Sequence, residues 1–159
     1  MKVLFDSAMS SDQRFQTSLL LLIITAVCCN AHLTDFSVYI KGTFLCRDEP
    51  FKNWPLEVMT DGQRFRYEDD MDRFTKENGQ FSIKAWTTVD AHMIRPYIVI
   101  QHNCWESKEV PHKCYRKIIQ VLEPDQVTRA SKTPNENIVV DFGTVDLRFK
   151  HKYELPTTC

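Results

Sequence analysis

Apolar and polar residues alternate with a period of two in short segments of this chain, and that alternation restricts the fold more than any other feature. Residues 36–41 and residues 81–86 are the clearest rows, each placing apolar side chains at every second position. A strand shows this pattern when one face is buried and the other is exposed to solvent. No segment after residue 31 shows sustained helical periodicity. The pattern therefore predicts an all-β protein in which two sheets pack their apolar faces together.

Turn residues divide the chain into about seven short strands, a spacing typical of a β-sandwich. Gly42 is expected to mark a bulge before residues 43–46, and Asp61-Gly62 is expected to end the strand that contains Leu56 and Val58. Residues 97–104 are the most apolar segment and predict a buried central strand. Strands are also expected at 114–122 and 138–147, with a long loop over 123–137.

The first 31 residues are predicted to be a signal peptide. Residues 18–29 are almost continuously apolar and follow Lys2 and Arg14, and small residues end the segment at Ala31. A membrane anchor is the competing interpretation, but a bilayer span needs about 20 apolar residues and this run is shorter. Translation could also begin at Met9. Cleavage after Ala31 would leave residues 32–159 as one β-sandwich domain with His32 at its start, without a transmembrane segment, and secreted to the extracellular space or cell surface.

The formal net charge of the whole chain is −1 at pH 7. A chain so close to neutral has no overall field that would attract nucleic acid, so no nucleic-acid partner is expected. A local patch could still bind a charged partner. Lys113, Tyr115, Arg116 and Lys117 form one candidate patch for a ligand or partner, against the simpler interpretation of an exposed, charged strand face.

The mature part would keep four cysteines, Cys46, Cys104, Cys114 and Cys159. An even number in a small exported chain indicates disulfides, and four cysteines allow three pairings. A zinc site built from His102-x-Cys104 and His112-x-Cys114 is the alternative. It is disfavoured because its thiols would have to stay unpaired in an oxidising compartment.

No catalytic residue, metal site or cofactor is predicted. The acidic run Glu68, Asp69, Asp70 and Asp72 lacks the turn glycine that a calcium loop needs, and is expected to be a solvated loop. The chain has no Gly-x-Ser-x-Gly elbow, and its histidines are scattered.

The order of these features resembles the transthyretin-like family that nematodes secrete, across residues 36–159. Five groups of residues carry the resemblance. They are Val38, Ile40, Gly42 and Cys46; Thr75, Gly79 and Phe81; Pro96, Tyr97, Ile100, His102 and Cys104; Cys114 and Arg116; and Gly143, Val145, Leu147 and Cys159.

The resemblance implies a transthyretin-like (prealbumin/immunoglobulin-like) sandwich in an extracellular setting. Two activities of related proteins are not expected to carry over. The hydroxyisourate hydrolases end in a Tyr-Arg-Gly-Ser tail, whereas this chain ends in Glu-Leu-Pro-Thr-Thr-Cys. Hormone-carrying transthyretins line a tetramer channel with their last strand, and the corresponding tail here is short and contains Pro156.

The resembled fold also leads to an expected disulfide pairing. It places the first strand parallel to the strand at 138–147, which would bring Cys46 near the tail that carries Cys159. Cys104 and Cys114 flank a loop between two strands, and a bridge is geometrically easy if those strands form a hairpin. Cys46–Cys159 and Cys104–Cys114 are the predicted pairs.

The sequence thus favours a secreted, non-enzymatic binding module that recognises a small apolar ligand, a lipid or a cell-surface protein. A hydrolase on the same sandwich and a structural cuticle or matrix component are the alternatives. Fold analogy alone cannot decide among them.

Overall fold

The structure, a computed structural model, describes residues 33–105 and 114–158, which belong to one compact unit that starts at Leu33. Strands account for the regular structure of these residues apart from two short 3-10 helices, η1 (Asp70–Arg73) and η2 (Pro124–Gln126). The predicted signal peptide lies outside the described residues. Within the described ranges, no helix has the length and apolar character needed to cross a membrane.

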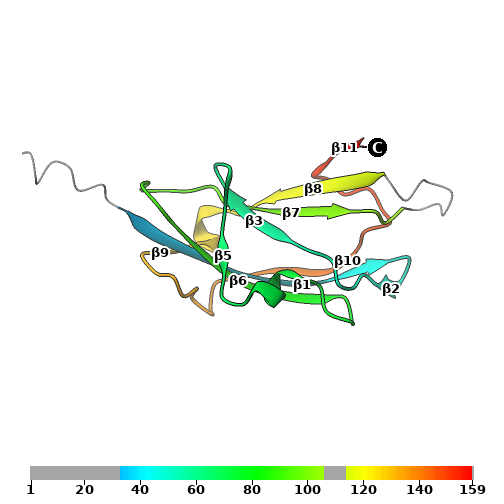
Figure 1. Ribbon diagram of the computed structural model, residues 1–159, viewed down its shortest axis with the longest axis horizontal. Helices are drawn as coiled ribbons and strands as arrows, with labels where there is room; N and C mark the ends of the chain where they lie inside the picture. Colours follow the sequence, from blue (N-terminus) through cyan, green and yellow to red (C-terminus); the bar gives the residue numbers. More distant parts are fainter. Residues whose placement is uncertain (1–32, 106–113, 159) are drawn as a thin grey trace, which may run out of the picture. The chain divides into compact units, whose positions relative to one another are not determined.

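Two sheets pack face to face, as Figure 1 shows, and this confirms the predicted all-β sandwich. The first sheet has the order β10-β1-β6-β5, with β2 and β9 also paired to β1. Its strands are β1 (Thr34–Cys46), β2 (Glu49–Pro50), β5 (Arg66–Tyr67), β6 (Gln80–Val89), β9 (Thr128–Arg129) and β10 (Val139–Asp146). β1 runs antiparallel to β6 and parallel to β10, the parallel neighbour that the family resemblance implied.

The second sheet has the order β11-β8-β7-β3-β4, and its neighbouring strands are antiparallel. Its strands are β3 (Glu57–Thr60), β4 (Gln63–Arg64), β7 (Tyr97–His102), β8 (Tyr115–Val121) and β11 (Glu154–Thr158). β7 is central and largely buried, as its apolar sequence predicts. β11 was not predicted, and it covers the edge of β8.

The core lies between the sheets and is built from the inward rows of the alternating strands. Phe36, Val38 and Ile40 of β1 face Ile98 and Ile100 of β7 across it, all less than 3% exposed. Burying such side chains supplies most of the favourable free energy of folding, at about 25 cal/mol per Å² of apolar surface. The outward residues of the same strands remain available for binding.

The β1–β10 pairing is bulged at Gly42, as predicted, but the extra residue belongs to β10. β1 keeps a continuous register with β6 through Gly42, whereas β10 carries one extra residue where Lys41 pairs with Asp141 and Thr43 with Thr144. Gly143 of β10 has a φ of 61°, which suits a bulge glycine. Gly42, opposite the bulge, is also required by packing, because a Cβ there would lie 2.8 Å from Phe81 Cζ and 2.9 Å from Phe142 Cβ.

The predicted disulfide pairing is wrong. Cys46 is bonded to Cys104, with their Cα atoms 5.7 Å apart, and Cys114 is disulfide-bonded as well. β7 and β8 do form the expected hairpin. However, Cys104 continues the inward row of Ile98, Ile100 and His102, so its side chain points at the opposite sheet, where Cys46 ends β1. The Cys46–Cys104 bond therefore joins the two sheets.

Candidate functional site

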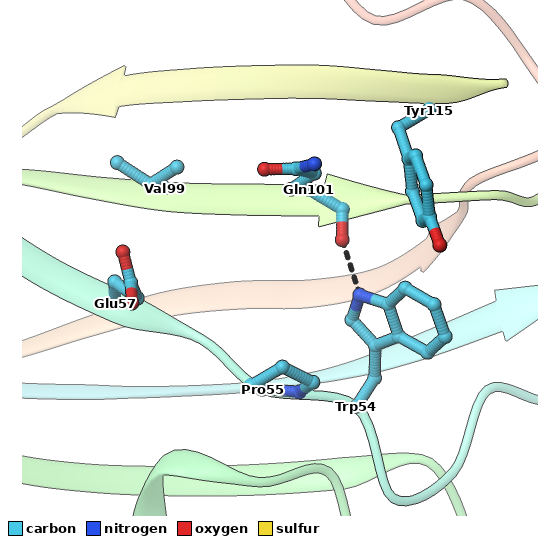
Figure 2. A pocket seen from close by; sticks show the side chains of 6 residues that line it. All are labelled: Trp54, Pro55, Glu57, Val99, Gln101 and Tyr115. Carbon is cyan, nitrogen blue, oxygen red and sulfur yellow. Dashed lines mark hydrogen bonds between the residues drawn. The ribbon is translucent and has the colours of Figure 1, made fainter. Parts of the chain in front are cut away.

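A groove of about 460 Å³ lies on the outer face of the second sheet (Figure 2). It spans the segment before β3, then β3, β7 and the start of β8. Its lining residues are Trp54, Pro55, Glu57, Val99, Gln101 and Tyr115. Sites for small ligands generally have volumes of about 300–1,000 Å³ and mostly apolar walls with a few polar groups. The groove meets both criteria.

Trp54 forms one wall and is fixed by contacts on three sides. Its backbone N–H donates to Thr75 Oγ1 at 2.9 Å, and its indole Nε1–H donates to the backbone carbonyl of Gln101, the dashed line in Figure 2. Its ring centroid lies 4.9 Å from that of Phe51. Pro55 forms an isolated bridge with Phe74. The wall is thus preformed, so a ligand would not need to order it.

Two polar side chains of the groove, Glu57 and Gln101, belong to strands β3 and β7. Glu57 points outward from β3, and its carboxylate is paired with Arg64 of β4, so its charge already has a partner. Gln101 is exposed at the end of β7, and its side-chain amide can donate and accept hydrogen bonds. The groove therefore favours a largely apolar ligand that carries an uncharged hydrogen-bonding group.

The apolar surface continues beyond the groove across the same face. Val121 of β8 and Leu155 of β11 are 47% and 43% exposed. Met59 and Tyr97 are paired neighbours on β3 and β7 and are partly buried. The outer face of the second sheet is consequently less polar than a solvated sheet face normally is.

The candidate patch predicted from the sequence does not stay together in the structure. Tyr115 lines the groove and is 37% exposed, and Lys117 lies two positions along the same outer row. Arg116 points the opposite way, into the sandwich, and is only 4% exposed. Including Arg116 in a surface patch was therefore wrong, because alternate residues of a strand face opposite sides. Lys113 lies outside the described residues.

Arg116 is the centre of a buried polar cluster that joins β8 to the C-terminal segment. Its guanidinium forms a two-pronged ion pair with Glu154 of β11, with Nε 2.7 Å from Glu154 Oε1. It also donates to the backbone carbonyls of Cys104, Leu147, Arg148 and Phe149 at 2.9–3.2 Å. A planar guanidinium suits this role because it presents five donors in a fixed geometry.

The same cluster sets the protonation of Glu154. Burial alone would raise the pKa of Glu154. The hydrogen bonds from Arg116 and from the His151 backbone N–H, together with the positive charge of Arg116, hold it below its ordinary value instead. Glu154 is thus ionised at neutral pH, and the pair is structural rather than poised for proton transfer.

His102 lies near this cluster, in the core. Its side chain is fully buried, and neither ring nitrogen has a hydrogen-bond partner among residues 33–105 and 114–158. Burial and the nearby charge of Arg116 lower its pKa to about 4. Cys104 is in a disulfide, which removes the predicted alternative of a zinc site at His102-x-Cys104, while His112 falls outside the described residues. In residues 33–105 and 114–158, no three His, Cys, Asp or Glu side chains are grouped as metal ligands would be.

The acidic run at 68–72 begins a 3-10 turn. Asp69 caps η1, and its Oδ1 accepts the Met71 backbone N–H at 2.9 Å. The Asp69 carboxylate therefore supports the local structure of this surface segment.

Comparison with known proteins places this chain in a family. A sequence profile described as the transthyretin-like family matches residues 41–122, just over half of the chain. The chain is also 28% identical over 111 residues to transthyretin-like protein 46 of Caenorhabditis elegans. That match covers 69% of this chain and 60% of the length of the relative.

This chain belongs to the transthyretin-like family, as its sequence motifs suggested. The matched region includes β3, β7 and β8, and every residue that lines the groove. Of the residues that line the groove, the sequence analysis had identified Tyr115 but not Trp54 or Gln101. A Trp-Pro pair immediately before a strand was the available signal.

Proposed function

We propose that this protein is a secreted binding module that holds a small apolar ligand in the groove between Trp54 and Tyr115. The observation that carries the proposal is the preformed wall at Trp54, whose backbone and indole are both anchored before any ligand arrives. A rigid aromatic wall contributes apolar contact area at little cost in conformational entropy. A fatty acyl chain is one ligand that would suit the groove.

Two features support export of the chain. Residues 1–31 have the pattern of a signal peptide, as described above. The inter-sheet bond between Cys46 and Cys104 is typical of proteins that fold in an oxidising compartment. Both agree with an extracellular setting, as proposed for the whole chain.

A binding role is favoured over hydrolysis. A general base must lie within hydrogen-bonding reach of its substrate. His102 is fully buried, its pKa is about 4, and the groove is lined by other residues. Our proposal is therefore that the groove binds its ligand without chemical change.

Titration with N-phenyl-1-naphthylamine, a neutral apolar fluorophore, tests the groove. We expect saturable binding with one site per chain, and competition by the uncharged 1-oleoylglycerol if the natural ligand carries a fatty acyl chain. The substitution Trp54→Ala should weaken binding about tenfold or more, since removing an indole wall loses roughly 1.5–3 kcal/mol of apolar contact.

Trp86→Ala is the matched control, because Trp86 lies on the other sheet. This variant also loses one tryptophan side chain, and its affinity for N-phenyl-1-naphthylamine should be unchanged. Equal affinity in the wild type and the Trp54→Ala variant, or no saturable binding at all, would rule out the groove as the site.

A further inference from the structure

The outer face of the first sheet is more polar than the outer face of the second sheet, which carries the groove. Outward positions of β6 are occupied by Ser82, Lys84 and Trp86, and their inward neighbours fill the core. Tyr39 of β1 lies beside them and accepts a hydrogen bond from Ser82 Oγ at 3.5 Å. Among the described residues, none of the large hydrophobic side chains exposed to solvent belongs to β1, β6 or β10.

Three cations on this face are held over aromatic rings. Arg66 and Lys132 both lie over Trp86, at 5.0 Å and 4.6 Å from the ring centroid. Lys84 lies 5.3 Å from the centroid of Tyr39. Such contacts fix a cation in place by attraction to the ring. An aromatic ring attracts the cation without neutralising its charge.

The charges around Trp86 leave a local excess of positive charge. Lys84 is paired with Glu136 at 2.8 Å, whereas within the described ranges neither Arg66 nor Lys132 forms an ion pair. Glu68 lies beside Lys84 and Lys132, and Glu68 and Asp70 line the surface next to Arg66 and Arg73. Four cations, Lys84, Lys132, Arg66 and Arg73, thus face three carboxylates, Glu136, Glu68 and Asp70. The two cations on Trp86 are the ones free to bind an external anion.

The space around these cations suits a polyhydroxylated ligand. A hollow of about 150 Å³ beside Trp86 is lined by Lys84, Lys132 and Thr133, among others. Farther along β1 and β6, a second hollow of about 370 Å³ contains Thr43, Ser82, Thr144 and the Lys41–Asp141 pair. Hydroxyl groups and ammonium groups at intervals along one sheet face match the hydroxyl and acidic groups of a sugar chain.

We propose that this face binds an acidic polysaccharide, with its sulfate or carboxylate groups at Arg66 and Lys132. An anionic membrane is disfavoured, because among the described residues β1, β6 and β10 carry no exposed large apolar side chain to insert among lipids. The site is independent of the proposed ligand groove, which lies on the opposite sheet.

Isothermal titration of the folded protein with a heparin dodecasaccharide tests this site. We expect binding that weakens with added salt, since neutralised anions release counterions. The double substitution Arg66→Gln/Lys132→Gln should reduce the affinity by about tenfold or more, because hydrogen bonds to charged groups contribute strongly.

Lys150→Gln/Lys152→Gln is the matched control. It removes two positive charges from exposed side chains elsewhere, one of which, Lys152, also lies over an aromatic ring at 5.1 Å. The control should keep wild-type affinity, and desulfated heparin should bind more weakly than heparin. Equal losses in both double variants would show nonspecific charge attraction and overturn the proposal. The proposal would also be overturned if the protein bound phosphatidylserine vesicles through Arg66 and Lys132 but did not bind heparin.

Discussion

At the scale of single residues, the ring of His102 lies in the core beside Arg116, and this placement makes folding dependent on pH. The pKa of His102 is about 4 in the folded protein and about 6.5 in an unfolded chain. The unfolded state therefore binds an extra proton between these values, and it is favoured as the pH falls. Glu154, Arg116 and His151 are the charged or titratable groups that act on this ring.

We predict that the free energy of unfolding falls by up to about 3 kcal/mol between pH 6.5 and pH 4 through His102 alone. Urea denaturation across this range should show a smaller loss in a His102→Leu variant. A His92→Gln variant changes an exposed histidine and should behave like the wild type. An unchanged pH dependence in the His102→Leu variant would show that His102 is not the group responsible.

At the scale of elements, the Cys46–Cys104 bond fastens the end of β1 to the segment after β7. It links two sheets that also pack face to face and are joined by the hydrogen bond from the Val58 backbone N–H of β3 to Tyr67 Oη of β5. The bonded residues are 58 positions apart in the sequence, so the bond restricts a long loop in the unfolded chain.

Replacing both cysteines, Cys46→Ala/Cys104→Ala, should lower the free energy of unfolding by about 4 kcal/mol in the chain-entropy account. Denaturation by guanidinium measures this loss. Peptide mapping without reduction should recover a linked peptide that contains Cys46 and Cys104. A linked peptide joining Cys104 to Cys114 would contradict the structure and restore the pairing expected from the hairpin.

The strands could largely be predicted from the sequence, because the alternation that buries one face is a local property. The row of Ile98, Ile100, His102 and Cys104 shows this well. Because Cys104 continues this inward row, its side chain points toward the opposite sheet. The prediction of a Cys104–Cys114 bond, which rested on the β7–β8 hairpin, did not take this into account. The partner Cys46 lies far away in sequence, so only the packing of the two sheets brings the sulfurs together.

β11 and its ion pair were harder to predict. Glu154 and Arg116 are 38 positions apart, and each is an ordinary surface residue by type. Their burial depends on the carbonyls of residues 147–149, which become acceptors only when the chain turns there. The groove depends on tertiary structure in the same way, because Trp54 becomes a wall only through its bonds to Thr75 and Gln101.

At the scale of the whole molecule, the two sheets present outer faces of different chemistry. The face of the second sheet carries the apolar groove at Trp54, and that of the first carries the cations at Trp86. A module of this kind could hold an apolar ligand on one side while attached to an acidic matrix on the other. The groove is central to this account, since the proposed function depends on it.

Native mass spectrometry of the protein recovered from the medium of secreting cells tests that claim most directly. We predict a chain that begins at or within a few residues of His32 and carries one small noncovalent ligand, which is lost in the Trp54→Ala variant and retained in Trp86→Ala. A protein found only in membranes with residues 1–31 intact would contradict secretion. A secreted wild-type chain with no bound ligand, and no affinity for N-phenyl-1-naphthylamine, would contradict the binding function.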